Sequence, residues 1–265
     1  MCWCDRADSS AAAATINKWV ADNTNNKVTE IVSADSVNAL TRLVLVNAVY
    51  FKGDWLKKFD EQSTQMIDFH VSPKEKLMVK TMQMKAKFYY GVNQELKCQA
   101  LELPYTGDSL SMFIILPDHP DTNLAEVEKK LTSDDLVNVT DRFQMAFLEV
   151  SVWLPKFRLD EKMSVAEVLS EMGMKDLFVG GVADLSGVDG TKELFVSKVL
   201  HRAVVDVNEE GTEAAAATAV VMMLRCASIT KQYYFRADHP FIFFIQHKPT
   251  KSILFLGRLV KPPAA

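Results

Sequence analysis

A nine-residue run of almost wholly apolar side chains, Leu43–Phe51, constrains the fold of this chain more than any other segment. Apolar and polar residues do not alternate along it, as they would in a strand with one solvent-exposed face, so the run predicts a strand buried on both faces. Such a strand needs a large core around it. The chain has 265 residues, of which 48% are hydrophobic, and this is enough for one domain spanning residues 1–265.

Helical and strand-like patterns follow one another through the rest of the sequence. One helix is predicted within residues 15–32, followed by an irregular exit through the Asn-rich stretch 23–26. The other predicted helices cover residues 123–131, 133–139 and 164–172, the last ending at Gly173. The predicted strands are a pair within residues 100–116, a strand at 147–155 and a buried hairpin formed by 241–245 and 253–256. The mixture predicts an α+β fold with large antiparallel-rich sheets and several helices.

Two of these helices begin with recognisable capping residues. We expect the helix at 123–131 to be capped by the Asp or Thr that precedes it, and the helix at 133–139 to be capped by Ser133.

Composition argues against several classes of partner. A formal charge of −4 and a pI near 5.8 provide no field that would attract nucleic acid, and no window is apolar for long enough to span a membrane. The first six residues contain charges where a secretory peptide needs an apolar run, so no signal peptide is expected in this chain. The cysteines at positions 2, 4, 98 and 226 are too few and too scattered for a disulfide framework or a metal site, and no cofactor is expected.

Motif-borne catalysis has no support in the sequence. The chain lacks a G-x-S-x-G elbow, an H-E-x-x-H helix, a P-loop and a dinucleotide fingerprint, and its five histidines lie far apart. We therefore do not expect an enzyme. One sequon, Asn138-Val139-Thr140, makes Asn138 a candidate glycan acceptor if a longer precursor is secreted.

The segment at 207–227 allows two interpretations. Its four consecutive alanines favour a helix. It also contains neither Pro nor Gly from Thr212 to Leu224, as an interior strand requires. In a strand, the small residues at 212, 214, 216, 218 and 220 would share one face, whereas the charge of Glu213 would lie on the other. Bulky apolar residues and then one cation, Arg225, end the segment.

Six motifs, taken together and in order, resemble those of the serpin family of protease inhibitors. They are Asn47–Trp55, Leu101–Tyr105, Leu154–Phe157, Asp184–Val188, Glu209–Thr218 and Ala237–Phe241. The resemblance covers the chain from about Arg6 onward and is closest to inhibitory members. The sequence as a whole resembles serpins of arthropods such as ticks.

The resemblance implies a bait loop within residues 209–230, presented to a serine protease outside the cell. Arg225 lies fourteen positions after Gly211, where the family places the residue before the cleaved bond. The bond is thus expected between Arg225 and Cys226, which implies a trypsin-like protease as partner. After cleavage the loop inserts into the main sheet, a mechanism typical of the family. The neighbouring subsite residues are Met222, Met223, Leu224 and Ala227.

Other positions match structural sites of the family. The hinge, at which insertion begins, corresponds to Glu209, Glu210, Gly211, Thr212, Glu213, Ala214, Ala215, Ala216, Ala217 and Thr218. Asn47 and His201 match the shutter near the opening of the sheet. Gly53, Trp55 and Lys156 match the breach, where the loop enters, and Lys156 is expected to pair with Glu209.

Complete members of the family have roughly a hundred further residues before this point, so the chain is expected to be N-terminally truncated. Two alternatives to inhibition therefore stay open: an inactive or substrate-like fragment, and a non-inhibitory serpin. Incomplete burial of the sheet would also favour self-association through loop–sheet pairing.

Overall fold

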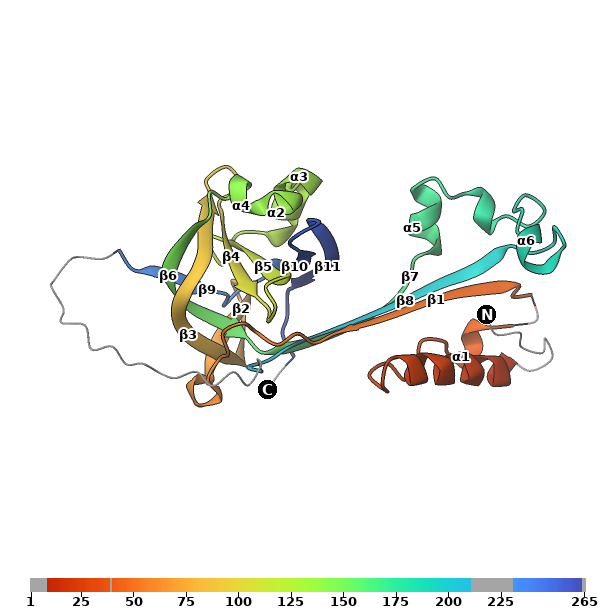
Figure 1. Ribbon diagram of the computed structural model, residues 1–265, viewed down its shortest axis with the longest axis horizontal. Coiled ribbons are helices and arrows are strands. Elements are labelled where there is room, and N and C mark those ends of the chain that lie inside the picture. The colour runs from red at the N-terminus through yellow and green to blue at the C-terminus, as the bar shows by residue number, and fades with distance from the viewer. Residues whose placement is uncertain (1–8, 39, 211–230, 264–265) are drawn as a thin grey trace. The chain divides into compact units, whose positions relative to one another are not determined.

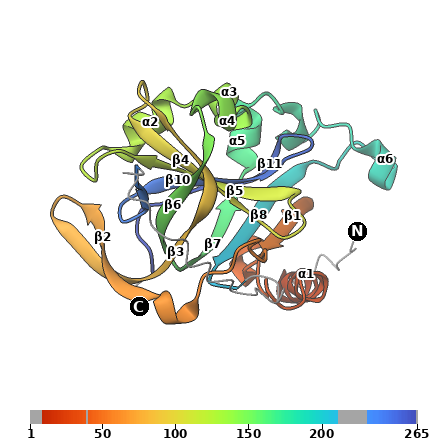
Figure 2. The same ribbon diagram turned by 60° about the vertical axis from the view of Figure 1, so that its left-hand side comes forward.

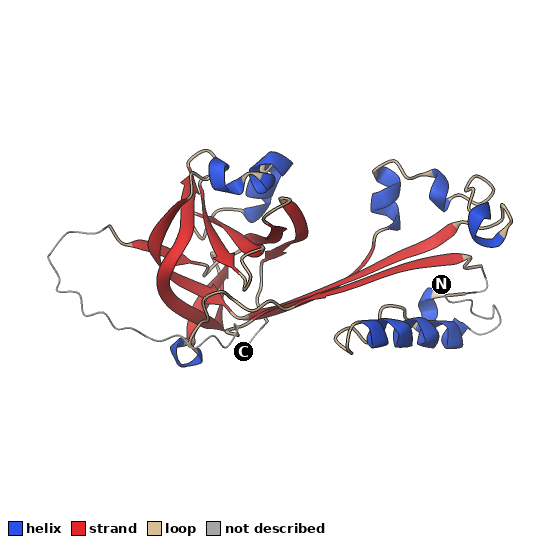
Figure 3. Cartoon of the chain, viewed as in Figure 1, coloured by secondary structure: helices blue, strands red, loops and turns tan. Residues whose placement is uncertain are grey.

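A computed structural model describes residues 9–38, 40–210 and 231–263 (Figure 1). The chain forms two compact units, each built from two separate stretches. The first unit comprises Met1–Lys52 and Arg158–Asp206, and the second comprises Gly53–Phe157 and Val207–Ala265. Helices and strands are both present in the described residues (Figure 3), which confirms the α+β class. The expectation of a single domain stays a prediction.

The first unit is built on a three-stranded sheet with the order β1-β8-β7. Its strands are β1 (Leu43–Phe51), β8 (Val196–Val207) and β7 (Phe157–Ser164). Its helical elements are α1 (Ser9–Asn23), η1 (Ala34–Ser36), α5 (Ala166–Glu171), η3 (Asp176–Phe178) and α6 (Ser186–Asp189). The β1–β8 pair is parallel and places Asn47 opposite His201.

The prediction that β1 is buried on both faces is wrong. Helix α1 supplies Ala13 and Val20 to a core that the alternate residues Val44, Val46 and Ala48 of β1 join. On the other face of the strand, Leu45 is 41% exposed. The strand bounds agree with the prediction, but one face of this apolar run is only partly covered in the described residues.

The second unit contains an eight-stranded sheet with the order β11-β10-β5-β4-β3-β6-β9, in which β2 pairs with β3. The strands are β2 (Gln65–Ser72), β3 (Glu75–Asn93), β4 (Cys98–Pro104), β5 (Leu110–Pro117), β6 (Ala146–Pro155), β9 (Tyr233–Arg236), β10 (Phe241–His247) and β11 (Ser252–Leu259). The short η2 (Glu61–Ser63) precedes β2.

Strand β3 holds this sheet together because its 19 residues pair with three strands in succession. It pairs with β2 up to Thr81, with β6 from Thr81 to Tyr90, and with β4 from Tyr90 to Asn93. Figure 2 shows this long strand extending from β2 toward β4. All three pairings are antiparallel, and only the pairing of β6 with β9 is parallel among those recorded in this sheet.

The core of the second unit lies between the sheet and three short helices. Phe113 of β5 and Phe244 of β10 stack with ring centroids 5.1 Å apart, in a cluster that includes Val127, Val139 and Phe143. The helices are α2 (Leu124–Lys130), α3 (Ser133–Val137) and α4 (Val139–Arg142). None of the described helices is long and apolar enough to cross a membrane.

The capping predictions need correction, as does the burial of the hairpin. Asn123 caps α2 by accepting from the Ala125 amide at 3.0 Å. Thr132, not Ser133, caps α3 in a reciprocal box with Asp135. In the hairpin, β10 is buried almost throughout, whereas β11 alternates between exposed and half-buried positions.

Gly91 makes a close backbone approach that suggests a stability test. A Cβ atom there would lie 2.1 Å from the Phe143 carbonyl oxygen and 2.9 Å from the Met145 Cα. Since both are backbone atoms, Gly91→Ala should lower stability by about 1–3 kcal/mol, measured by thermal unfolding. Gly187→Ala is the control because its Cβ would meet nothing within 4 Å, and equal losses in both variants would contradict the prediction.

Candidate functional site

The candidate site lies in the second unit, where residues 53–56 meet residues 208–210. Trp55 is 3% exposed, and its ring stacks on that of Tyr105 with centroids 4.5 Å apart. The indole Nε1 donates to the Asn208 carbonyl at 2.7 Å, and the Trp55 amide donates to the Glu210 carbonyl at 3.3 Å. The indole thus fixes the backbone of the segment that follows β8.

Two side chains bind the carboxylate of Glu209. Lys156 Nζ donates to Oε2 at 2.7 Å, and Thr64 Oγ1 donates to Oε1 at 2.8 Å. The side chain of Glu209 is 6% exposed, whereas that of Lys156 is 43% exposed. Burial alone would raise the pKa of Glu209, but the hydrogen bonds from Lys156 and Thr64 outweigh it and hold the pKa below its ordinary value.

The structure brings two predicted breach residues to the start of the predicted hinge. The Trp55 amide bonds the Glu210 carbonyl, and the expected ion pair of Lys156 with Glu209 is present. Gly53 lies two residues before Trp55 and is half-buried. The roles that the sequence assigned to these residues in loop entry stay predictions.

The shutter residues belong to the first unit. Asn47 and His201 are direct partners in the β1–β8 register, as neighbours at a sheet opening would be. Asn47 is exposed and His201 is half-buried.

The predicted bait loop lies almost entirely outside the described residues. Gly211 to Thr218 of the hinge, the subsite residues Met222, Met223, Leu224 and Ala227, and the bond between Arg225 and Cys226 are not described. The chain is described again from Lys231, just before β9.

Sequence reasoning did not identify Thr64 or the Asn208 carbonyl as parts of the site. Thr64 lies 145 residues before Glu209 and belongs to no recognisable pattern. The carbonyl is a backbone group, so no residue type marks it.

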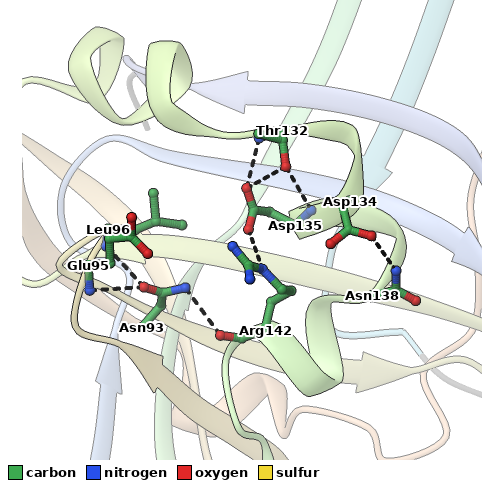
Figure 4. Close-up of polar contacts among 8 residues, drawn as sticks. All are labelled: Asn93, Glu95, Leu96, Thr132, Asp134, Asp135, Asn138 and Arg142. Atoms are coloured by element: carbon green, nitrogen blue, oxygen red, sulfur yellow. Dashed lines mark hydrogen bonds and ion pairs between the residues drawn. The ribbon is translucent and has the colours of Figure 1, made fainter.

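The side chain of Asn138, the candidate glycan acceptor, is already engaged on both of its polar atoms. Its amide nitrogen donates to Asp134 at 2.7 Å, and its oxygen accepts from Lys251 at 2.7 Å. Figure 4 shows Asn138 beside the Thr132–Asp135 cap, which Arg142 also joins. A glycan would replace one hydrogen of the amide nitrogen that bonds Asp134, and glycosylation stays a prediction.

Other reactive groups give no second site in the described residues. No group of three or more His, Cys, Asp and Glu side chains among them could hold a metal ion. Cys98 is a free and buried thiol. Burial raises the pKa of this thiol to about 12, and the nearby Asp118 carboxylate adds to the rise.

Residues 4–262 match the family described as Serpin (serine protease inhibitor). The chain belongs to the serpin family. It is 49% identical over 254 residues to the leukocyte elastase inhibitor of Bos taurus, covering 95% of this chain and 67% of that protein. For the leukocyte elastase inhibitor of Homo sapiens the identity is 45% over 257 residues, covering 96% of this chain and 67% of that protein.

Solved serpin structures agree with the fold. Uncleaved ovalbumin matches with a TM-score of 0.85 at 33% identity, over 97% of this chain and 64% of that one. Serpin48 of the insect Tenebrio molitor matches with a TM-score of 0.81 at 34% identity, over 98% of this chain and 67% of that one. The chain spans about two thirds of the length of these relatives. The curated relatives named here are vertebrate proteins, so they give no support to an arthropod origin.

In this serpin chain, Lys156→Ala should lower stability by about 1–2 kcal/mol near pH 7, because it leaves the buried carboxylate of Glu209 with one donor fewer. The expected loss is smaller than for a fully buried pair, since the Lys156 side chain is itself partly exposed. The lowered pKa of Glu209 means that the stabilisation is complete above its ordinary value near pH 4.5 and is lost as the pH falls through the folded-state pKa. The loss should therefore shrink in more acidic buffer. Thermal unfolding between pH 3 and pH 7 measures it.

The control for that test is Lys85→Ala, which breaks a pair with Glu149 in which both side chains are more than half exposed. It should change stability by less than about 0.5 kcal/mol. A loss in Lys156→Ala that is independent of pH would contradict the role of the Glu209 charge.

Alkylation of the folded chain should leave Cys98 unmodified, since its thiol is buried and almost no thiolate forms at pH 8. Cys226 is expected to react first, because a bait loop must stand clear of the body. Mass spectrometry after a short iodoacetamide pulse distinguishes the two. Equal labelling of both thiols, in a chain shown to be folded, would contradict this expectation.

Proposed function

We propose that this chain carries the protease-recognition region of an inhibitor of trypsin-like serine proteases, with Arg225 as the residue before the cleaved bond. The observation that supports this most is the pair of hydrogen bonds that Lys156 and Thr64 donate to the Glu209 carboxylate. It fixes the chain on the N-terminal side of the bait segment, while the pairing of β9 with β6 fixes it on the C-terminal side. A segment held at both ends suits presentation to a protease cleft.

The sheet of the first unit supports the insertion mechanism. β1 and β8 pair directly along residues 43–51 and 196–205, with no strand between them. Insertion would part these two strands and place the small residues Thr212, Ala214 and Ala216 beside them. Because β8 leads into the segment, the inserted strand would run antiparallel to both neighbours. A long charged side chain at position 212 would oppose this step.

The protease class has a second candidate. The relatives named leukocyte elastase inhibitor favour an elastase-like target, for which a bond after an apolar residue such as Leu224 would be the cleaved one. The cation at Arg225 favours the trypsin-like class, because a buried carboxylate in the specificity pocket selects it. Comparing the cleavage positions of the two protease types discriminates between them.

Inhibition also competes with two other roles, a substrate-like fragment and a non-inhibitory serpin. The alanine-rich hinge favours an inhibitory loop, whereas the partly covered face of β1 favours a substrate or a self-associating chain. A denaturing gel after incubation with trypsin decides: a covalent high-mass band means inhibition, and cleaved products alone mean a substrate.

An extracellular site of action is a further proposal, based on the family resemblance alone. Its test is detection of the natural protein, with an antibody against residues 231–263, in medium and in washed cells. Retention in the cells would contradict it.

Trypsin should cut this chain first between Arg225 and Cys226, because the loop offers a cation after the bulky Met223 and Leu224. N-terminal sequencing of the released fragment should begin Cys226-Ala227-Ser228. Arg225→Ala should slow this cut at least about 100-fold, since the cation fills the specificity pocket.

The control is Arg158→Ala, which removes an exposed arginine of β7 and should leave both the first residue of the released fragment and the rate of this cut unchanged. Faster cleavage after Leu224 by an elastase-like enzyme than after Arg225 by trypsin would overturn the assignment to the trypsin-like class.

A further inference from the structure

One face of the second unit gathers aromatic and basic side chains from three adjacent strands. We call it the aromatic–basic face, and it consists of Lys85, Lys87 and Tyr89 of β3, Phe147, Glu149, Ser151 and Trp153 of β6, and Tyr234 and Arg236 of β9. Figure 1 shows these strands together. β6 pairs with β3 on one side and with β9 on the other.

The strand register places these side chains on one side of the sheet. Lys87 lies opposite Glu149, and Tyr89 lies opposite Phe147. Alternate residues of a strand share a face, so the whole set projects together. The intervening Val150 and Val152 of β6 are fully buried on the other side.

The aromatic rings of this face are exposed and already ordered. Tyr89, Phe147 and Tyr234 are 42%, 55% and 48% exposed. Tyr89 contacts Phe147 with ring centroids 5.3 Å apart, and the Arg236 guanidinium carbon lies 4.7 Å from the centroid of the Trp153 ring. Exposed rings and arginine, held in place before binding, are the side chains that dominate protein interfaces.

The charge of this face is opposite in sign to that of the chain. Lys85, Lys87 and Arg236 face one acid, Glu149, which Lys85 pairs at 2.8 Å. Lys57, with Nζ 5.8 Å from the centroid of the Phe147 ring, adds another cation at its border. The chain as a whole has a formal charge of −4. A basic patch on an acidic protein selects an acidic partner surface.

The position of the face in the chain places it within reach of a protease bound at the bait segment. Tyr234 follows Cys226 by eight residues, which span at most about 29 Å when fully extended. A folded domain of about 200 residues has a radius of gyration of about 16 Å and a diameter of about 40 Å. A protease engaged at Arg225–Cys226 is therefore large enough to touch the aromatic–basic face at the same time.

We propose that the aromatic–basic face is a second docking surface for the target protease, recognising an acidic patch beside the protease cleft. This inference rests on the proposed function. It adds a source of selectivity that the residues around the cleaved bond do not provide, because proteases that share one specificity pocket differ in surface charge. Its electrostatic part accelerates association and weakens as salt is added.

The test uses anionic and cationic trypsin, which share a specificity pocket and differ in net charge. For each enzyme, kcat/KM at Arg225–Cys226 in the folded chain is divided by kcat/KM for a synthetic peptide of residues 219–232. For anionic trypsin at low salt, Lys87→Ala with Arg236→Ala should lower this ratio about tenfold, with a smaller fall at 0.5 M salt. Cationic trypsin should respond less than about twofold.

The matched control is Lys129→Ala with Lys130→Ala, which removes two exposed cations from α2 and should leave the ratio unchanged. Lys87→Glu, a single exposed change, should lower the ratio as well, so a folding defect in the double variant cannot decide the result. Equal effects of face and control variants would overturn the inference, as would no effect with anionic trypsin. Loss of binding to a sulfated polysaccharide with an unchanged ratio would assign the face to that ligand instead and overturn it too.

The same experiment separates this inference from the proposed function. If neither trypsin cuts after Arg225, the proposed function fails and the inference fails with it. If both cut there and the ratio ignores the face, only the inference fails.

Discussion

The buried carboxylate of Glu209 is the interaction on which the candidate site depends. A charge with 6% of its side chain exposed is costly unless donors surround it. Here Lys156 reaches it from the end of β6 and Thr64 from the segment before β2. Residues that are distant in sequence thus converge on one acid, and the main chain after β8 has little freedom at this point. Trp55 adds a second restraint through the Asn208 carbonyl.

This rigidity contrasts with the β1–β8 pair of the first unit. Its ladder is parallel, and such pairings are slightly weaker per residue than antiparallel ones. If the bait segment inserts between these strands as proposed, the weaker ladder is the one that has to open. The antiparallel sheet built on β3 in the second unit, with its stacked phenylalanines, has no such requirement.

Much of the fold could be predicted from periodicity and apolar runs. The bounds of β1, the pair of strands within residues 100–116 and the helices near 124 and 133 all agree with the patterns that indicated them. The errors have local physical causes. Burial of β1 depends on which elements cover each face of the strand, and this cannot be deduced from a run of apolar residues. The choice among neighbouring capping residues depends on backbone geometry that propensity alone does not determine.

The candidate site was predictable to a different degree. Trp55, Lys156 and Glu209 could be named from the family resemblance, and the expected ion pair of Lys156 with Glu209 is present. Thr64 and the Asn208 carbonyl could not, because one lies far away in sequence and the other is a backbone atom. The residues around Arg225 depend on sequence alone, since the described part of the chain stops at Glu210 and resumes at Lys231.

The pairing of β1 with β8 has a consequence for how the chain acquires its structure. Asn47 and His201 are separated by 154 positions, so the ladder cannot form until β8 has been synthesised and has met β1. Loop closure of that length and a high contact order both slow folding. Throughout that delay the apolar run of β1 is an unpaired and aggregation-prone strand, the kind of exposed surface that molecular chaperones protect.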